Sequence, residues 1–453
     1  MGVGIHFDHL LLEAYMKLTN WGKYPVVEVN YKSFSAIPEL RQFVLENKQM
    51  IARGLGRCYG DSSLSKNVTS ILRFNRILSF DLITGEISCE AGISLKKLLD
   101  VFIPKGWFIP VVPGTKFVTV GGSIASDIHG KNHHIEGSFS NHLKSFLILL
   151  ADGSIIECSR ENNSDLFWAT CGGMGLTGII LQAKFKLKPI ETAYIKLQTI
   201  KCKNLSDVMN TFEKLSSYPY SVAWIDCLAS GNKLGRSILI LGEHAKVEDL
   251  PKNLNPLQIP EKRKFSIPFD LPNFVLNSLS VRAFNFFYYS SFPKSIKKSI
   301  IDYDSFFFPL DRVHDWNRIY GNKGFTQYQF VLPKASSKEG LESILTKISQ
   351  SNQASFLAVL KLFGAQEGLI SFPKEGYTLA LDFPISNKLF SLLDELDKII
   401  INYGGRVYLA KDVRINEEMF AKGYPNLEEF KLIKYKYDKF DKFKSLQSER
   451  ISI

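Results

Sequence analysis

Residues 118–134 read VTVGGSIASDIHGKNHH, the most informative run in the chain. The adjacent glycines Gly121 and Gly122 let backbone amides come close to a bound group, because no Cβ stands in the way. Backbone donors arranged in this way suit a pyrophosphate. Three histidines and Lys131 follow, and these side chains suit proton handling beside a cofactor.

A second glycine-rich run lies upstream, where residues 51–61 read IARGLGRCYGD. The spacing of Gly54, Gly56 and Gly60 misses the dinucleotide-binding fingerprint by one residue, and no acidic residue follows at the distance expected for a ribose contact. Taken alone, the run is equally typical of a tight loop between two elements. Two such loops, with histidines and a lysine after the second, together predict a cofactor site.

Length and composition predict a globular protein of two domains. The chain has 453 residues, of which 45% are hydrophobic, and a net charge of +11. This charge favours an anionic partner, such as a phosphorylated substrate, a phosphate-bearing cofactor or an anionic membrane surface, although lysines also keep surfaces soluble. No nucleic-acid-binding module is recognisable, so we expect no nucleic-acid partner. Six scattered cysteines without a C-x-x-C pair argue against zinc or any other metal, and against a disulfide framework.

The start of the chain lacks the basic and then apolar pattern of a secretory signal, and no stretch has the length of a membrane-spanning helix. We therefore expect a cytoplasmic protein. Peripheral contact with the inner membrane, and a location on its periplasmic side, both remain open.

The order of elements predicts an α+β protein. Residues 1–190 are expected to form one domain whose glycine loops converge, 191–405 a second domain built on an antiparallel sheet covered by helices, and 406–453 a segment that returns to the first domain. Period-two alternation and turn residues predict the strands, and helical periodicity the helices. The expected strands are 26–29, 70–74, 87–91, 146–150, 155–158, 179–187, 195–200, 221–226, 236–241, 326–332, 356–362 and 377–383, and the helices 95–102, 341–349 and 388–403.

Residues 274–308 are unusually rich in aromatic side chains, and Lys294, Lys297 and Lys298 follow the densest part. The simplest interpretation is buried core of the second domain. The alternative is a mobile cover or a membrane-contacting surface, in which aromatic rings lie at the interface and lysines meet anionic head groups.

The glycine loops and the histidine-rich run resemble the vanillyl-alcohol-oxidase class of flavoproteins, which carry a PCMH-type FAD-binding domain. More narrowly, the chain is similar to the family of decaprenylphosphoryl-ribose 2-oxidases, flavoprotein subunits of an epimerase. The resemblance covers nearly the whole chain, and its most specific part is 118–134. It is carried by residues 52–61, 113–122, 127–134, 325–330, 361–364 and 404–412.

The resemblance implies FAD, held without a covalent link, in a two-domain PCMH-type fold with a separate substrate domain. His129 matches the active-site histidine of the family, so it is not assigned as an attachment residue. The residues implied in FAD binding are Arg53, Gly54, Leu55, Gly56, Arg57, Cys58, Tyr59, Gly60, Asp61, Ser62, Gly114, Thr119, Val120, Gly121, Gly122, Ser126, Asp127, Ile128, His129, Ile179 and Tyr408.

Lys411 matches the essential lysine of the family. Oxidation of a secondary alcohol needs a hydride acceptor and a group that takes the hydroxyl proton, and a lysine beside a flavin can stabilise an alkoxide or act as the base. Without the resemblance, Lys411 is better interpreted as a surface lysine and His129 as a structural histidine, and either could take the proton. The residues implied in substrate binding are Tyr59, Lys131, Trp224, Gln327, Gln329, Lys361 and Phe363.

Two positions depart from the best-known members of the family. Ala380 stands where those members have a cysteine, and Thr378 stands where they have an asparagine. Nitroaromatic inhibitors that form a covalent adduct with that cysteine are therefore expected to fail. Flavin chemistry does not depend on either position, whereas the sugar that the site accepts can depend on both.

Three functions follow in order of preference. The first is FAD-dependent oxidation of a secondary hydroxyl of a polyprenyl-phosphate sugar to a keto-sugar, the first half of a 2′-epimerisation in cell-envelope arabinan synthesis, with an NAD(P)H-dependent short-chain reductase as partner. The alternative is oxidation of a soluble alditol or aldonolactone. A flavin-free binding protein is the third, and the presence of both Lys411 and His129 argues against it.

Overall fold

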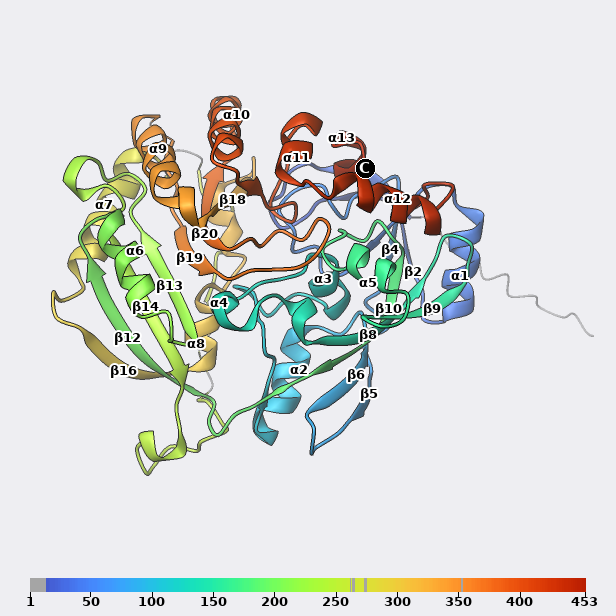
Figure 1. The fold of residues 1–453 in the computed structure, drawn as a ribbon, viewed down its shortest axis with the longest axis horizontal. Coiled ribbons are helices and arrows are strands. Elements are labelled where there is room, and N and C mark those ends of the chain that lie inside the picture. Colours follow the sequence, from blue (N-terminus) through green and yellow to red (C-terminus); the bar gives the residue numbers. More distant parts are fainter. Residues whose placement is uncertain (1–13, 261, 263–264, 273–274, 352) are drawn as a thin grey trace, which may run out of the picture.

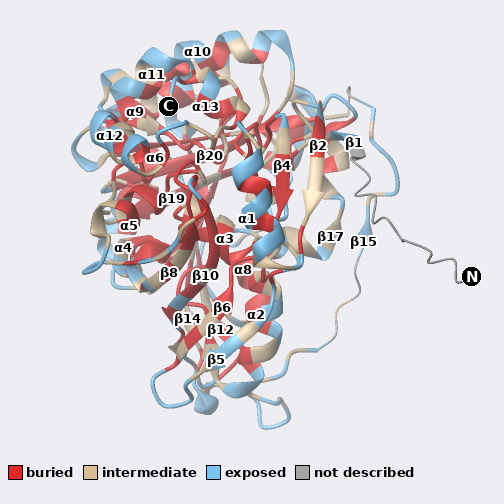
Figure 2. Cartoon of the chain, turned by 90° about the vertical axis from the view of Figure 1, so that its right-hand side faces the viewer, coloured by how far each residue is buried: buried red, intermediate tan, exposed pale blue. Residues whose placement is uncertain are grey.

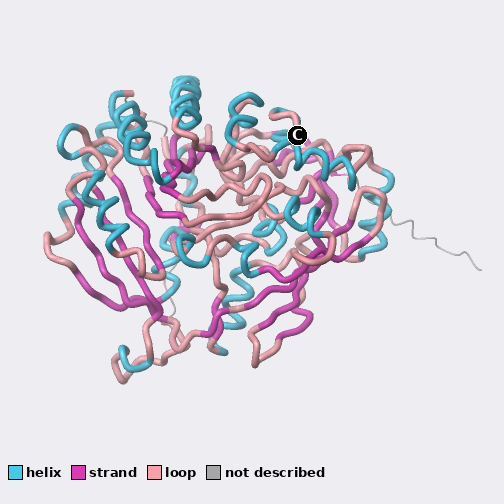
Figure 3. The backbone as a smooth tube through the Cα atoms, in the orientation of Figure 1, coloured by secondary structure: helices cyan, strands magenta, loops and turns pink. Residues whose placement is uncertain are grey.

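The computed structural model describes residues 14–260, 262, 265–272, 275–351 and 353–453. Its strands form two groups, and a broad band of loops lies between them (Figures 1 and 3). One group is an antiparallel eight-stranded sheet, and the other consists of smaller sheets near the N-terminus. The α+β fold with a large antiparallel sheet is confirmed.

The N-terminal group contains a four-stranded sheet and a five-stranded sheet. The first has the order β1 (Ala14–Leu18), β2 (Val27–Ser33), β4 (Asn67–Ser70), β3 (Ile51–Arg53), and the second the order β5 (Ile77–Phe80), β6 (Glu86–Glu90), β10 (Ile179–Lys186), β8 (Leu143–Leu149), β9 (Ile155–Ser159). The short strands β7 (Trp107–Phe108) and β11 (Lys188–Pro189) pair separately, and the helices here are α1 (Ile37–Glu46), α2 (Leu95–Phe102), α3 (Val120–Ala125), α4 (His133–Glu136) and α5 (Ser164–Thr170).

Helix α2 shows how local sequence produces these elements. The Ser94 side chain accepts a hydrogen bond from the amide of Lys97 and so caps the first turn. Leu95, Leu98 and Phe102 recur at helical spacing and are buried, so that one apolar stripe faces the core. The helix has the bounds that the sequence predicts.

The eight-stranded sheet is antiparallel throughout. Helices α6 (Leu205–Lys214), α9 (Ser337–Gln350) and α10 (Asn387–Asn402) pack on it, and Figure 2 shows buried strands beneath helices that expose their outer sides. The strand order is β16 (Lys297–Asp302), β12 (Tyr194–Cys202), β14 (Ser237–His244), β13 (Tyr220–Ile225), β19 (Ala358–Phe363), β20 (Gly376–Pro384), β18 (Phe325–Pro333), β21 (Arg406–Val407).

The remaining elements are α7, α8, the parallel pair β15 and β17, and three C-terminal helices. Helix α12 packs against α5 in the N-terminal group, where Met50 pairs with Phe443, whereas α11 packs against α10 and β21 of the eight-stranded sheet (Figure 1). The domain boundaries at 190 and 405 stay a prediction. The bounds are α7 (Ser278–Ser290), α8 (Tyr303–Phe307), β15 (Phe265–Ser266), β17 (Val313–His314), α11 (Glu417–Gly423), α12 (Leu427–Tyr437) and α13 (Leu446–Arg450).

Two expectations are corrected by the structure. The strand predicted over 70–74 ends at Ser70, because the chain turns there: the amide of Phe74 donates a hydrogen bond to the carbonyl of Ile71. The side chains of Ile71 and Phe74 are buried although they lie in a turn. The aromatic segment 274–308 is core only near its end, where Phe306 and Phe307 are buried, whereas much of α7 is exposed. Phe274 lies outside the described residues.

Candidate active site

One face of the eight-stranded sheet carries most of the side chains predicted to bind substrate. Strand side chains alternate between the two faces, and the register pairs Gln329 with Ala380, Gln327 with Asp382 and Lys361 with Thr378. The residues between them, such as Leu379, belong to the core beneath the helices. A polar surface therefore forms on the face opposite to the helices.

His129 lies against this face, where its Nε2 is 2.9 Å from Nε2 of Gln329. The same amide nitrogen donates to Oγ1 of Thr378 at 3.2 Å, and that hydroxyl donates to the carbonyl of Phe330. Since the amide nitrogen can only donate, Nε2 of His129 is the acceptor and Nδ1 carries the proton. Nδ1 is buried without a hydrogen-bond partner among the described residues, so its donor is free for a ligand.

The imidazole of His129 is enclosed by aromatic rings. The ring centroids of Phe363, Tyr408 and Phe372 lie 4.7, 5.1 and 5.6 Å from it. Burial lowers the pKa of His129 well below its usual range, and the positive charge of Lys361 lowers it further. The imidazole is therefore neutral at physiological pH.

Three buried lysines belong to this region: the charges of Lys361 and Lys411 act on His129, and the charge of Lys361 also acts on Lys131. Burial lowers the pKa of Lys131 to about 7 and that of Lys361 to about 8. Lys131 donates to the carbonyl of Phe306, whereas Lys361 has no ion pair or hydrogen bond within the described part of the chain. Cations held without carboxylates in a dry site favour binding of an anion.

Lys411 is the third of these lysines, and its Nζ lies 3.9 Å from the centroid of the Tyr59 ring. Burial lowers the pKa of its ammonium, the carboxyl of Asp382 acts in the opposite direction, and Lys361 lowers the pKa again. The side chain is therefore poised to exchange a proton, which is the property expected of a general base.

Asp382 is a residue of the site that the sequence did not single out. Its fully buried carboxyl accepts hydrogen bonds from Nε2 of Gln327 at 2.6 Å and from the hydroxyl of Tyr320 at 3.4 Å. Burial raises its pKa. The sequence did contain a signal for this residue: Asp382 is the one carboxylate in the strand predicted over 377–383, and it shares a face with Thr378 and Ala380.

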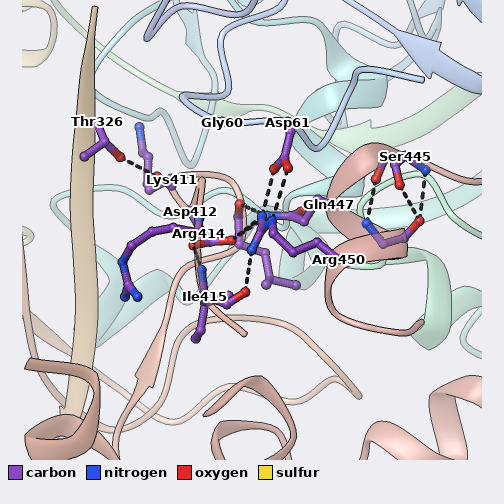
Figure 4. Close-up of polar contacts among 12 residues, drawn as sticks. Gly60, Asp61, Thr326, Lys411, Asp412, Arg414, Ile415, Ser445, Gln447 and Arg450 are labelled. Atoms are coloured by element: carbon purple, nitrogen blue, oxygen red, sulfur yellow. Dashed lines mark hydrogen bonds and ion pairs between the residues drawn. The ribbon is translucent and has the colours of Figure 1, made fainter. Parts of the chain in front are cut away.

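The loop that carries Lys411 is fixed by a buried ion cluster (Figure 4). Arg450 of α13 donates to both oxygens of Asp61, at 2.9 and 3.2 Å, and to Oδ2 of Asp412 at 2.8 Å. Gln447 donates to the same Asp412 oxygen and to the carbonyl of Leu409. One arginine thus ties the first glycine loop to the residue next to Lys411.

The two glycine loops meet, as the sequence predicts. A Cβ on Gly54 would lie 2.3 Å from Oγ1 of Thr119, and one on Gly60 would lie 1.8 Å from the carbonyl oxygen of Asp412. The amides of residues 55–58 donate no hydrogen bond to any described residue. A run of free backbone donors between close-packed loops fits the pyrophosphate of FAD, and Arg53 to Ser62 and Thr119 to Gly122 would hold it.

The other residues predicted to bind FAD differ in their surroundings. The Tyr408 hydroxyl donates to the carbonyl of Ser126, which brings Tyr408 to the run that leads to His129. Asp127 is buried and accepts from Ser371 and Ser140, so its role is to fix this run. A Cβ on Gly114 would meet nothing within 4 Å. The side chains of Val120, Ile128 and Ile179 are buried in the N-terminal core, so these residues can face FAD only with their backbone.

Comparison with known proteins agrees with this geometry. Residues 35–159 match the FAD binding domain family. The chain is 38% identical, over 412 residues, to decaprenylphosphoryl-beta-D-ribose oxidase of Mycolicibacterium smegmatis, covering 89% of each chain. A putative D-arabinono-1,4-lactone oxidase of Neurospora crassa is 28% identical over 36% of this chain and 30% of its own length. Delta(24)-sterol reductase of Mus musculus is 29% identical over 31% of this chain and 27% of its own length.

Fold, loops and lysines thus define an FAD-dependent oxidoreductase with a PCMH-type flavin-binding domain. Within that class, the chain belongs to the decaprenylphosphoryl-beta-D-ribose oxidase family. The match to the lactone oxidase is confined to about a third of the chain.

Proposed function

We propose that this protein oxidises a secondary hydroxyl of a polyprenyl-phosphate-linked pentose to a ketone, and that Lys411 and His129 divide the proton chemistry. The observation that carries the proposal is the group of buried lysines linked through Lys361, which itself lacks a carboxylate partner among the described residues. A phosphodiester next to the sugar supplies the anion that Lys361 lacks.

Lys411 is proposed to take the hydroxyl proton. A neutral amine is a base, and the lowered pKa of Lys411 makes the neutral form accessible near physiological pH. Held over the Tyr59 ring and next to Asp382, the amine accepts the proton as the carbon–oxygen bond becomes a carbonyl. FAD, when bound, supplies the hydride acceptor and is held without a covalent link.

His129 is proposed to orient the substrate. Its Nε2 accepts from Gln329, so its proton is on Nδ1 and the ring can only donate towards a ligand from that atom. A neutral donor of this kind binds the hydroxyl oxygen and fixes its direction relative to Lys411. Lys411 is thus the proposed base and His129 the proposed donor, because the hydrogen bonds from Gln329 to Thr378 and to His129 fix the protonated nitrogen of the imidazole.

Lys131 and Lys361 are proposed to bind the phosphate, and Phe363 and Trp224 to line the sugar and lipid side. The Trp224 ring is buried and lies 4.7 Å from that of Tyr288 on α7, at the outer end of the site face. The keto-sugar would leave for a short-chain reductase that uses NAD(P)H and completes the epimerisation. Within the described ranges no helix is long and apolar enough to cross a membrane; we propose a peripheral location at the inner membrane.

The test is an absorbance spectrum of the FAD-loaded protein before and after anaerobic addition of substrate. A polyprenyl-phosphate pentose is expected to bleach the flavin bands, whereas free pentitols and aldonolactones leave them unchanged. Bleaching by the soluble polyols alone would replace this proposal with the alditol or aldonolactone alternative. Reconstitution with FAD that yields no flavin bands would contradict both.

A further inference from the structure

Helix α7 exposes an apolar stripe on the side that faces away from the protein. Leu279, Ala283, Phe286 and Phe287 recur at helical spacing and form this outer stripe. Leu279 is 78% exposed, Phe286 56% and Phe287 69%. Two neighbouring phenylalanines exposed to this degree on one helix mark an interaction surface.

The inner side of α7 is firmly attached, so the outer stripe is held in place. Asn285 is buried and donates to Oδ1 of Asp226 at 2.7 Å. Arg282 donates to the carbonyl of Leu228, and the Tyr289 hydroxyl donates to that of Cys202. The helix is a fixed platform at the outer edge of the eight-stranded sheet (Figure 1).

The charged residues within the segment that carries α7 are of one sign, and the nearby carboxylate of Asp226 is paired with Arg236. Residues 271–301 contain no aspartate or glutamate, and they contain Arg282, Lys294, Lys297 and Lys298. The three lysines are exposed, and none forms an ion pair with a carboxylate in the described part of the chain. Exposed aromatic rings beside unpaired lysines complement a surface that is apolar inside and anionic outside.

An aromatic path joins the platform to the proposed substrate site. The ring of Trp224 lies against Tyr288, Tyr288 stacks on Phe284 at 5.7 Å, and Phe284 lies 4.9 Å from Phe356. Trp224 projects from the site face, and Phe284 is itself exposed. A continuous row of aromatic rings therefore runs from the site face to the exposed surface of α7.

We propose that the outer stripe of α7, with Lys294, Lys297 and Lys298, docks on the surface of an anionic phospholipid bilayer. Phe286 and Phe287 enter the boundary between head groups and acyl chains, and the lysines bind the anionic head groups. The docking itself is independent of the reaction; only the link to the aromatic path rests on the proposed function.

The experiment is co-sedimentation of the FAD-loaded full chain with vesicles. We expect binding to vesicles of phosphatidylglycerol and phosphatidylcholine, and much weaker binding to phosphatidylcholine alone. The double variant Phe286→Ser/Phe287→Ser should bind at least tenfold more weakly. Replacing all three lysines by glutamine should weaken binding by on the order of a hundredfold and remove most of its salt dependence.

A matched control is the pair Leu432→Ser/Phe440→Ser, in α12 and just beyond its end, where the side chains are 73% and 80% exposed and lie outside the platform. Its binding should equal that of the unsubstituted protein. Equal losses of vesicle binding in the control would overturn the proposal. So would unchanged binding by both the phenylalanine variant and the lysine variant. The flavin spectrum of each variant establishes that it is folded.

Turnover of a short-chain, water-soluble polyprenyl-phosphate pentose separates docking from substrate binding. The Phe286→Ser/Phe287→Ser variant should retain the unsubstituted rate with this substrate. A parallel fall in its turnover and its vesicle binding would mean that the stripe binds the substrate tail, and would overturn docking. Vesicle binding without any oxidation of lipid-linked sugar would support docking and contradict the proposed function.

Discussion

The two sides of the candidate active site are built differently. On the cofactor side, Arg450 pairs with both Asp61 and Asp412, and the loops pack so closely that Gly60 has no room for a Cβ. On the substrate side, Lys361 has no such partner in the described chain, and α7 exposes phenylalanines. The difference teaches that loops around a cofactor are fixed by satisfied side-chain contacts, which leave backbone amides to hold the group, whereas a ligand that enters and leaves requires reserved charge and apolar surface.

Replacement of Lys411 should have the largest effect on activity. Lys411→Met keeps the length of the side chain but removes the base, so we expect the rate of substrate-dependent flavin bleaching to fall by about 10²- to 10⁴-fold. The FAD content should be unchanged, because the ion cluster that fixes the loop remains. Near-normal bleaching in this variant would contradict the role assigned to Lys411.

Arg450→Ala should have the largest effect on stability. It leaves the carboxylates of Asp61 and Asp412 buried without their shared partner, and we expect a loss of about 3–5 kcal/mol in the free energy of unfolding. The control is Lys422→Ala, which removes an exposed pair with Glu418 and should cost less than about 0.5 kcal/mol. Denaturant unfolding measures both, and similar losses would contradict the contrast drawn above.

Lys361→Met should have the opposite effect on stability. Burial lowers the pKa of Lys361 from 10.5 to about 8 in the folded chain, so its charge opposes folding most strongly below pH 8 and ceases to do so above pH 10.5. The variant should thus gain thermal stability at pH 7, and less at pH 10. Its KM for the polyprenyl-phosphate-linked sugar should rise roughly 10- to 100-fold, with a smaller change in kcat. A loss of stability at pH 7 would show that Lys361 is structural.

Asp382→Asn should change the pH profile more than the maximal rate. The carboxyl of Asp382 raises the pKa of Lys411, so its removal should move the rise of kcat/KM with pH to lower pH. Activity at high pH, where Lys411 is already neutral, should change little. A profile that stays in place while the rate falls at every pH would indicate a purely structural role.

Thr378→Val should have the smallest effect. It removes the acceptor that orients the Gln329 amide and thereby the tautomer of His129. Loss of one hydrogen bond of about 1 kcal/mol predicts a fall in kcat of roughly three- to tenfold. Thr378→Ser, which keeps the hydroxyl, should restore the rate; failure of serine to do so would contradict the proposed hydrogen-bond chain.

Much of this fold was predictable because its signals are local. Alternation in 326–332 and 377–383 predicts strands that the structure contains as β18 and β20, and helical periodicity in 95–102 predicts α2. The meeting of the two loops was predictable because glycines mark positions of close approach, and the structure leaves no room for a Cβ at Gly54, where the loops touch.

The parts that the sequence did not reveal depend on contacts between distant segments. Asp382 acquires its role only because β20 lies beside β18 and near the loop of Lys411, and strand order is not encoded in either strand alone. Aromatic content could not distinguish core from surface in 274–308. The helical spacing of Leu279, Phe286 and Phe287 opposite Val281 was the signal that separates the two sides of α7.

The most direct test of the central claim compares two ligands that differ by the presence of the charged phosphate. A polyprenyl-phosphate pentose and the uncharged polyprenyl glycoside of the same pentose are titrated anaerobically, with flavin absorbance as the readout. We predict that the phosphorylated ligand bleaches the flavin at concentrations on the order of a hundredfold lower, because Lys131 and Lys361 bind its phosphate. Equal bleaching by both ligands would contradict the account of the substrate side as a site that reserves its positive charge for an anion.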